Sequence, residues 1–232
     1  MNTTSNILAL DASSSKCSVA LTLEGRTLVR SASNPRQAAQ LLLPMTRELL
    51  SESKLELQQL DAIAVASGPG SFTGLRIAIG VAQGLSLAAN LPVVPLSNLA
   101  ILSFMALENC DKDAALACLE ARDGEVYFAA YRRDLGLGVK LIGVEQVAQI
   151  SELEIESLAS VEPNCWIAVG DAFAEPQRIE QRTGIEASVG IVHGELAIEQ
   201  LCKLASLQFA AGKSVPSEEV QPNYIKEQLD YS

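Results

Sequence analysis

The sequence has a single histidine, His193, and its five cysteines are far apart, with no Cys-x-x-Cys pair among them. One histidine and scattered cysteines do not supply the closely spaced ligands of a zinc site, and they predict no disulfide framework. We therefore expect no metal site and interpret the cysteines as core thiols in a reducing cytosol. The start of the chain lacks a basic segment followed by an apolar one, which argues against export and favours a cytoplasmic location.

Basic residues are also scarce, with 17 Lys and Arg against 28 Asp and Glu and a formal net charge of −11. Residues 1–100 contain 7 basic and 6 acidic side chains, which leaves 10 basic and 22 acidic side chains, a net charge of −12, for residues 101–232. Affinity for nucleic acid comes largely from Lys and Arg that neutralise phosphates. The composition therefore argues against tight binding of RNA or DNA by this chain alone, and a basic partner would be needed.

Charged residues are absent from 77–107, a run of 31 residues that is long enough to suggest a membrane span. Polar residues and prolines interrupt this run at Gln83, Asn90, Pro92, Pro95 and Asn98. They divide it into a helix of about four turns, a turn and a short strand. We therefore expect the run to be buried inside a soluble protein that has no membrane partner.

The most informative segment that is present is Ser67-Gly-Pro-Gly-Ser-Phe-Thr-Gly-Leu-Arg76, which follows an apolar run and precedes a stretch rich in small residues. Its glycines remove side chains from a strand-to-helix turn, and Ser71 or Thr73 can cap the helix. A helix N-terminus reached by such a turn favours anions, phosphate above all. The segment matches neither the Gly-x-Gly-x-x-Gly nor the P-loop pattern, so a tight turn without a ligand is an open alternative.

Apolar periodicity predicts the order of the elements. Strands are expected at 6–11, 17–23, 27–31, 62–66, 93–94 and 166–169, and helices at about 35–53, 74–89 and 195–211. Strands followed by alternating helices and strands are typical of an α/β protein.

The second half of the sequence repeats the opening at an offset of 109 residues. Residues 7–21 and 116–130 align without a gap, and in both copies an apolar strand ends in an acid, Asp11 or Glu120. A polar turn and a second strand follow in each copy. This matched pattern is expected of a duplicated sheet unit.

Two lobes that each open with a strand, an acid-ended turn and a strand resemble the actin-like ATPase superfamily of ribonuclease-H-like folds. Further segments are similar to motifs of the TsaB (YeaZ) family, and these are Leu8-Ala-Leu-Asp-Ala12, Gly80-x-Ala-Gln-Gly-Leu85, Leu119-x-Ala-Arg-x-Gly-Glu-Val-Tyr127 and Gln221-Pro-x-Tyr-Ile-Lys226, together with the glycine-rich segment. The resemblance implies an α/β fold of two lobes, with mixed sheets flanked by helices and an abbreviated second lobe. Residues 1–101 would form the first lobe and 102–232 the second, and the last helix could pack back on the first lobe.

The resemblance also implies a function. The TsaB family provides the dimerisation subunit of the bacterial complex that forms threonylcarbamoyladenosine in tRNAs that read codons beginning with A. The implied partners are TsaD, which transfers threonylcarbamoyl and would be bound and activated, and TsaE, an ATPase that would be recruited; the isolated chain would form a homodimer. ATP or ADP and a metal would belong to these partners, and tRNA would be contacted only through the complex. TsaD holds its metal with a His-x-x-x-His pair, and the equivalent residues 35–44 contain no histidine.

No catalytic residue is therefore expected, and the predicted site is a partner interface on two helices. It consists of Leu41, Leu42, Met45, Leu49, Arg76, Ile77, Gly80, Val81, Gly84 and Leu87. Glycines inside a helix are unfavourable by about 1 kcal/mol each relative to alanine, so they indicate a close backbone approach. The approaching element is either the chain's own sheet or a helix of a partner.

The residues that could hold phosphate are Asp11, Ser13, Ser14, Gly68, Gly70, Ser71, Thr73 and Gly74. A second interpretation of Asp11 is a strand-end acid that accepts hydrogen bonds from turn N–H groups. Two other functions remain open, an actin-like ATPase or phosphotransferase that uses these loops, and a peptidase. The peptidase is disfavoured because Ser67 and Ser71 lie in no Gly-x-Ser-x-Gly pattern and a triad would need the distant His193.

Overall fold

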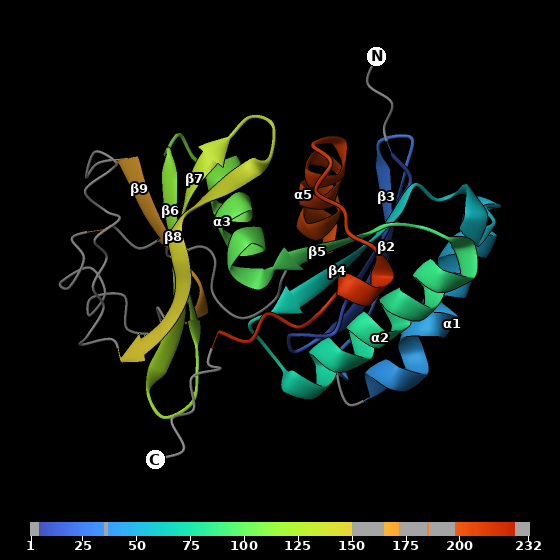
Figure 1. The fold of residues 1–232 in the computed structure, drawn as a ribbon, viewed down its shortest axis with the longest axis horizontal. Helices are drawn as coiled ribbons and strands as arrows, with labels where there is room; N and C mark the ends of the chain where they lie inside the picture. The colour runs from blue at the N-terminus through green and yellow to red at the C-terminus, as the bar shows by residue number, and fades with distance from the viewer. Residues whose placement is uncertain (1–4, 35–36, 150–164, 172–184, 186–197, 226–232) are drawn as a thin grey trace. The chain divides into compact units, whose positions relative to one another are not determined.

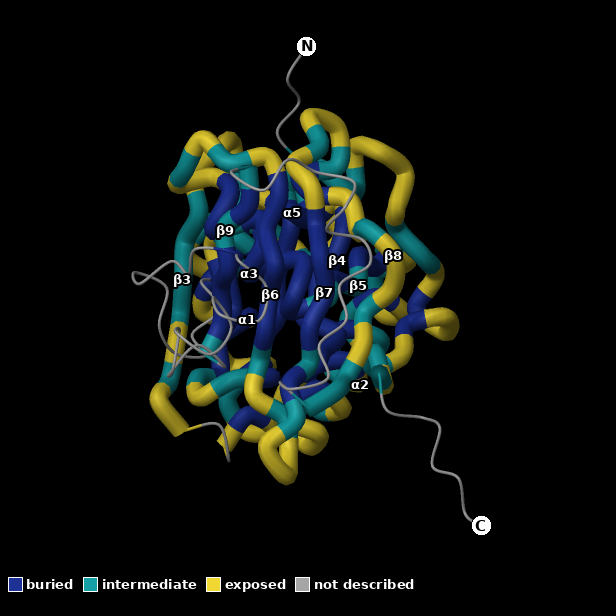
Figure 2. The backbone as a smooth tube through the Cα atoms, turned by 90° about the vertical axis from the view of Figure 1, so that its left-hand side faces the viewer, coloured by how far each residue is buried: buried dark blue, intermediate teal, exposed yellow. Residues whose placement is uncertain are grey.

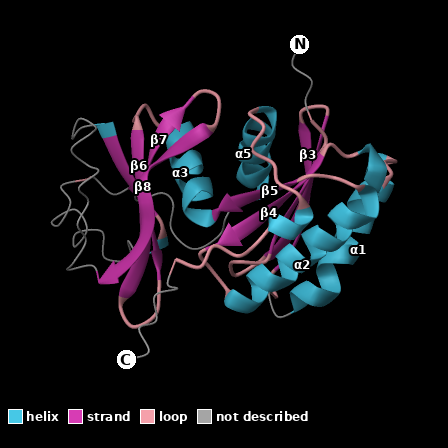
Figure 3. Cartoon of the chain, viewed as in Figure 1, coloured by secondary structure: helices cyan, strands magenta, loops and turns pink. Residues whose placement is uncertain are grey.

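A computed structural model of the chain describes residues 5–34, 37–149, 165–171, 185 and 198–225 (Figure 1). The chain divides into two compact units. Unit 1 comprises Met1–Asn98 and Glu195–Asn223, and unit 2 comprises Leu99–Gly194 and Tyr224–Ser232. Each unit contains its own β-sheet, and helices accompany the sheets (Figure 3), so the α/β class expected from the sequence is confirmed.

The sheet of unit 1 has five strands in the order β3-β2-β1-β4-β5. Their bounds are Ile7–Asp11 for β1, Cys17–Leu23 for β2, Arg26–Ala32 for β3, Ala62–Gly68 for β4 and Val93–Ser97 for β5. β1 pairs antiparallel with β2 and parallel with β4, so the sheet is mixed. β1 and β4 are buried along their whole length because both of their faces are covered, whereas much of the edge strand β3 is only half-buried (Figure 2).

Helices cover both faces of this sheet. The helix bounds are Ala38–Ser53 for α1, Phe72–Ala89 for α2 and Ile198–Ala210 for α5, and short 3₁₀ turns lie at Leu57–Gln59 (η2) and Ser217–Glu219 (η7). α1 and α2 lie side by side on one face, and α5 lies on the other (Figure 1). Successive strand residues point to opposite faces, so Leu8 and Leu10 of β1 belong to the core under α1 and α2, while α5 contacts β1 on the opposite face.

The sheet of unit 2 has the order β8-β7-β6-β9. The bounds are Ala114–Glu120 for β6, Glu125–Asp134 for β7, Gly138–Gln149 for β8 and Trp166–Val169 for β9. β6 pairs antiparallel with β7 and parallel with β9, and β7 pairs antiparallel with β8. This is the pairing pattern of β1 with β2 and β4, and of β2 with β3, so the repeat predicted from the sequence is confirmed.

The charge-free run at 77–107 is divided among α2, β5 and a further helix, α3 (Asn98–Glu108). The sequence predicted the division but not α3, which is buried along most of its length. By length and composition alone α2 could cross a membrane, a property that core helices of soluble proteins share. Because α2 packs against β4 with six buried residues, we interpret it as a core helix.

Candidate partner-binding face and strand-end loops

The turn after β1 surrounds Asp11, which is only 1% exposed. Its Oδ1 accepts hydrogen bonds from the Ser13 N–H at 2.7 Å and the Ser13 hydroxyl at 2.5 Å, and its Oδ2 accepts one from the Ser14 hydroxyl at 3.5 Å. Burial raises the pKa of Asp11 above its ordinary value, and these hydrogen bonds partly oppose the rise. The carboxyl group is thus engaged by its own turn, in agreement with the strand-end interpretation.

The glycine-rich segment packs directly on this turn. The Ser71 N–H donates to the Ser13 carbonyl oxygen at 2.8 Å. A Cβ at Gly70 would lie 2.6 Å from the Ser13 carbonyl oxygen, and a Cβ at Gly74 would lie 1.8 Å from the Ala12 carbonyl oxygen. Glycine is required at both positions because two stretches of the chain's own backbone touch there.

Ser71 is the N-cap of α2, as the sequence predicted, and its hydroxyl accepts a hydrogen bond from the Gly74 N–H at 3.3 Å. The helix therefore begins at Phe72, two residues before the predicted start. Thr73, the other candidate cap, lies exposed in the first turn. Gly68 ends β4 with a φ of +110°, a conformation that favours glycine, and the Asn223 N–H donates to the neighbouring Ser67 carbonyl at 2.7 Å.

Asn98 links the two loops, and the sequence analysis did not identify it. The residue is buried, and its Nδ2 donates to the Ser13 hydroxyl oxygen and to the Pro69 carbonyl oxygen, both at 2.8 Å. Since a carbonyl only accepts, the Pro69 contact sets the orientation of the amide and leaves the Ser13 hydroxyl to donate to Asp11. Within the described part of the chain, the Asn98 Oδ1 has no hydrogen-bond partner.

The structure therefore brings together Asp11, Ser13, Gly70, Ser71 and Gly74, with Ser14 beside them. Their hydrogen bonds and close contacts run between the two loops themselves. This geometry favours the open alternative of a tight turn that closes on its own chain. The assignment of these residues to a phosphate site stays a prediction.

One face of α2 is exposed and carries small and apolar residues. Phe72 and Leu87 are 54% and 73% exposed, and Arg76, Gly80 and Gly84 lie between them on the same side of the helix. A Cβ at Gly80 or Gly84 would meet no atom within 4 Å. The alternative that these glycines let α2 approach the chain's own sheet is therefore wrong. The Arg76 guanidinium lies 3.7 Å from the centre of the Phe72 ring, a cation–π contact.

The predicted contribution of α1 to this face needs correction. Leu42, Met45 and Leu49 are buried in the core of unit 1, because the apolar stripe of α1 faces the sheet. Leu41, Ile77 and Val81 are partly buried and pack against the same core. The large apolar side chain that α1 does expose is Leu43, at 49%.

Possible metal ligands and free cysteines are present among the described residues. In the described ranges, no group of three or more His, Cys, Asp and Glu side chains could hold a metal ion, and His193 lies outside these ranges. Burial and the charge of Asp11 raise the pKa of Cys17 to about 11, and burial also raises the pKa of Cys118 and Cys202. Nucleophilic cysteines need a lowered pKa, so these three are structural.

Comparison with known proteins identifies the family. The tRNA threonylcarbamoyladenosine biosynthesis protein TsaB of Escherichia coli (strain K12) is 35% identical over 224 residues, which cover 95% of this chain and 94% of that protein. The chain belongs to the TsaB family. TsaB of Haemophilus influenzae is 30% identical over 232 residues, which cover 97% of this chain and 95% of that protein.

Structural comparison agrees with membership of the TsaB family. The structure described as YeaZ from Pseudomonas aeruginosa has 38% sequence identity and a TM-score of 0.81, and the match covers 95% of this chain and 99% of that one. A family model described as "TsaD: tRNA N6-adenosine threonylcarbamoyltransferase" matches residues 32–213. The actin-like, ribonuclease-H-like fold expected from the sequence is thereby confirmed.

Proposed function

We propose that this TsaB-family chain is a non-catalytic subunit that binds and activates TsaD through the exposed face of α2. The name of its relatives assigns them to the biosynthesis of threonylcarbamoyladenosine in tRNA. The observation that carries the proposal is the pair of helical glycines, Gly80 and Gly84, whose missing side chains face open space.

Gly80 and Gly84 destabilise α2 by about 2 kcal/mol relative to two alanines. Among the described residues, no atom lies within 4 Å of a Cβ built at either position, so no close packing there offsets this loss. A helix of another protein that packs closely over Gly80 and Gly84 would offset it. The exposed Phe72 and Leu87 at the two ends of the face would supply apolar contact area to the same helix.

TsaD suits the role of partner because the TsaD family model matches residues 32–213 of this chain, a range that includes α1 and α2. A related fold would present equivalent helices, so helix could pack against helix about a pseudo-twofold axis. The same geometry permits two copies of this chain to pair when TsaD is absent. The proposal therefore includes a heterodimer with TsaD and a homodimer of the isolated chain.

The catalytic steps of threonylcarbamoyladenosine formation are proposed to take place on the partner proteins. The Asp11 carboxyl group is engaged by its own turn, and the backbone of Ala12 and Ser13 fills the space beside Gly70 and Gly74. ATP or ADP and a metal are accordingly assigned to TsaD and to TsaE, which would be recruited to the joint. With a net charge of −11 the chain would meet tRNA only through the complex, in the cytoplasm.

The test is to measure TsaD binding by calorimetry, and tRNA modification by the reconstituted complex, with two variants of α2. Leu87→Asp places a charge on the face, and Gly84→Trp places a large ring where the free chain has open space. We expect each to raise the Kd for TsaD by more than about tenfold and to reduce modification in parallel. The matched control is Leu135→Asp, the same change at a side chain of unit 2 that is 96% exposed.

Two results would overturn this function. One is TsaD binding that Leu87→Asp and Gly84→Trp leave at the level of Leu135→Asp. The other is hydrolysis of ATP, or transfer of threonylcarbamoyl, by the isolated chain at the rate of the full complex, which would support the actin-like enzyme instead.

A further inference from the structure

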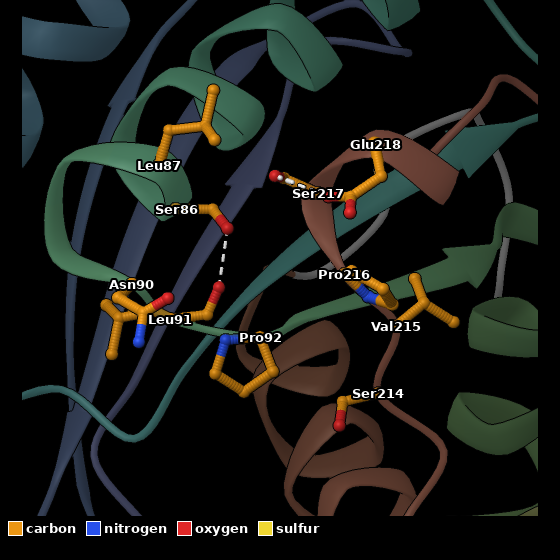
Figure 4. Close-up of a pocket in the computed structure, with 10 residues that line it drawn as sticks. All are labelled: Ser86, Leu87, Asn90, Leu91, Pro92, Ser214, Val215, Pro216, Ser217 and Glu218. Carbon is orange, nitrogen blue, oxygen red and sulfur yellow. Dashed lines mark hydrogen bonds between the residues drawn. The ribbon is translucent and has the colours of Figure 1, made fainter.

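A pocket of about 590 Å³ lies in unit 1 where α2 ends. Leu87, Asn90 and Leu91 line one side, and Pro216, Ser217 and Glu218 line the opposite side (Figure 4). The two sides are held in place by a short antiparallel bridge in which Val93 and Val215 exchange backbone hydrogen bonds of 2.9 and 2.8 Å.

Hydrogen bonds also hold the rim in position. The Gln83 side chain donates to the carbonyl oxygens of Ser217 and Val220, both at 3.1 Å, and ties η7 to α2. The Ser86 hydroxyl donates to the Leu91 carbonyl oxygen (Figure 4). The pocket is therefore preformed in the free chain, and a ligand would not have to order it.

The groups that line the pocket give it a negative electrostatic potential. The carbonyl groups of the last turn of α2 carry the negative end of the helix dipole, and this turn contains no basic residue. Glu218 adds a carboxylate on the opposite side, and the lining residues include no Lys or Arg. The rest of the lining combines apolar side chains, among them Leu91, Pro92 and Val215, with the polar side chains of Asn90 and Ser214.

Apolar side chains beside a negative rim suit a ligand that has an alkyl stem and a positive end, which is the form of Lys and Arg side chains. Leu87 belongs both to the exposed face of α2 and to this pocket. A protein that covers the face would thus bring its own side chains to the mouth of the pocket.

We propose that the pocket at the end of α2 receives a Lys or Arg side chain of the protein that docks on α2. The alkyl stem contacts Leu91 and Pro216, and the charged group lies between Glu218 and the last carbonyls of α2. This inference rests on the proposed function, since it names a contact of the same partner. It adds an electrostatic anchor to a face whose only charged residue is Arg76.

The experiment compares two adjacent charge reversals in the full chain. Glu218→Lys reverses the carboxylate that lines the pocket, while Glu219→Lys makes the same change in net charge at an exposed neighbour that does not line it. We expect Glu218→Lys to raise the Kd for TsaD about tenfold and Glu219→Lys to change it less than about twofold. Thermal unfolding of each variant checks that both fold like the parent chain.

Salt dependence provides a second measurement. Raising the salt concentration from about 50 to about 500 mM screens exposed charge pairs, so the Kd of the parent chain should rise more than the Kd of Glu218→Gln. Equal effects of the two reversals, or equal salt dependence of the parent chain and Glu218→Gln, would overturn the anchor while leaving the docking face intact. No binding of TsaD by the parent chain would overturn the proposed function as well.

Discussion

Two pairs of glycines, only a few residues apart, have opposite surroundings. Gly70 and Gly74 lie where the loop into α2 touches the turn after β1, and a Cβ on either would collide with backbone oxygen atoms. Gly80 and Gly84 lie farther along α2, and a Cβ on either would meet nothing within 4 Å. The first pair is explained by the fold of unit 1, and the second pair is not.

The loop glycines and the helix glycines of this segment are under two different kinds of structural constraint. A loop glycine that cannot accept a methyl group contributes to folding, whereas a helix glycine with open space around it weakens folding. The second kind requires a reason outside the free chain, and the proposed docking partner would provide one. Substitutions at the two pairs should therefore change stability in opposite directions.

The largest effect is expected from Gly74→Ala. Its Cβ would lie 1.8 Å from the Ala12 carbonyl oxygen, so the loop and the turn must move apart. We expect a loss of about 3 kcal/mol in the free energy of unfolding, because backbone atoms cannot move aside as a flexible side chain can. Urea denaturation followed by circular dichroism measures the loss. Stability equal to that of the parent chain would show that the two loops are not in contact.

A smaller loss is expected from Asn98→Ala, which removes the amide that links the same two loops. The buried Pro69 carbonyl oxygen would lose its donor, at a cost of about 1 to 2 kcal/mol in unfolding free energy. Asn109→Ala is the matched control, since this exposed amide directly follows α3 and donates to the Met105 carbonyl oxygen of that helix. A loss no greater than that of the control would mean that Asn98 does not hold the loops together.

Local patterns explain why much of unit 1 could be predicted. The alternation in β2, the apolar run of β4 and the glycines after it each specify their structure within a few residues. Asn98 could not be found in this way, because its partner Ser13 lies 85 residues away. The sequence does not predict α3, because this helix is apolar all round and lacks the amphipathic period of a surface helix.

The candidate partner-binding face shows a different limit of prediction from sequence. The sequence predicts a partner contact for the apolar stripe with Leu42, Met45 and Leu49, yet this stripe faces the chain's own sheet. A stripe of this kind has the same sequence whether it covers a core or another protein, so periodicity alone cannot assign it. The glycines of α2 were equally ambiguous, and only the space around Gly80 and Gly84 in the structure excluded contact with the chain's own sheet.

The smallest effect is expected from Gly80→Ala and Gly84→Ala. These two variants test the difference between the two pairs of glycines most directly. Each should raise the free energy of unfolding by about 1 kcal/mol, because alanine favours the helix and its methyl group meets open space. Each methyl group would also occupy the place proposed for a helix of TsaD, so the affinity for TsaD should fall while stability rises. Urea denaturation and calorimetric titration with TsaD measure the two quantities on the same preparation. If stability and affinity rise together, the open glycines are not reserved for a partner, and the docking face must lie elsewhere on unit 1.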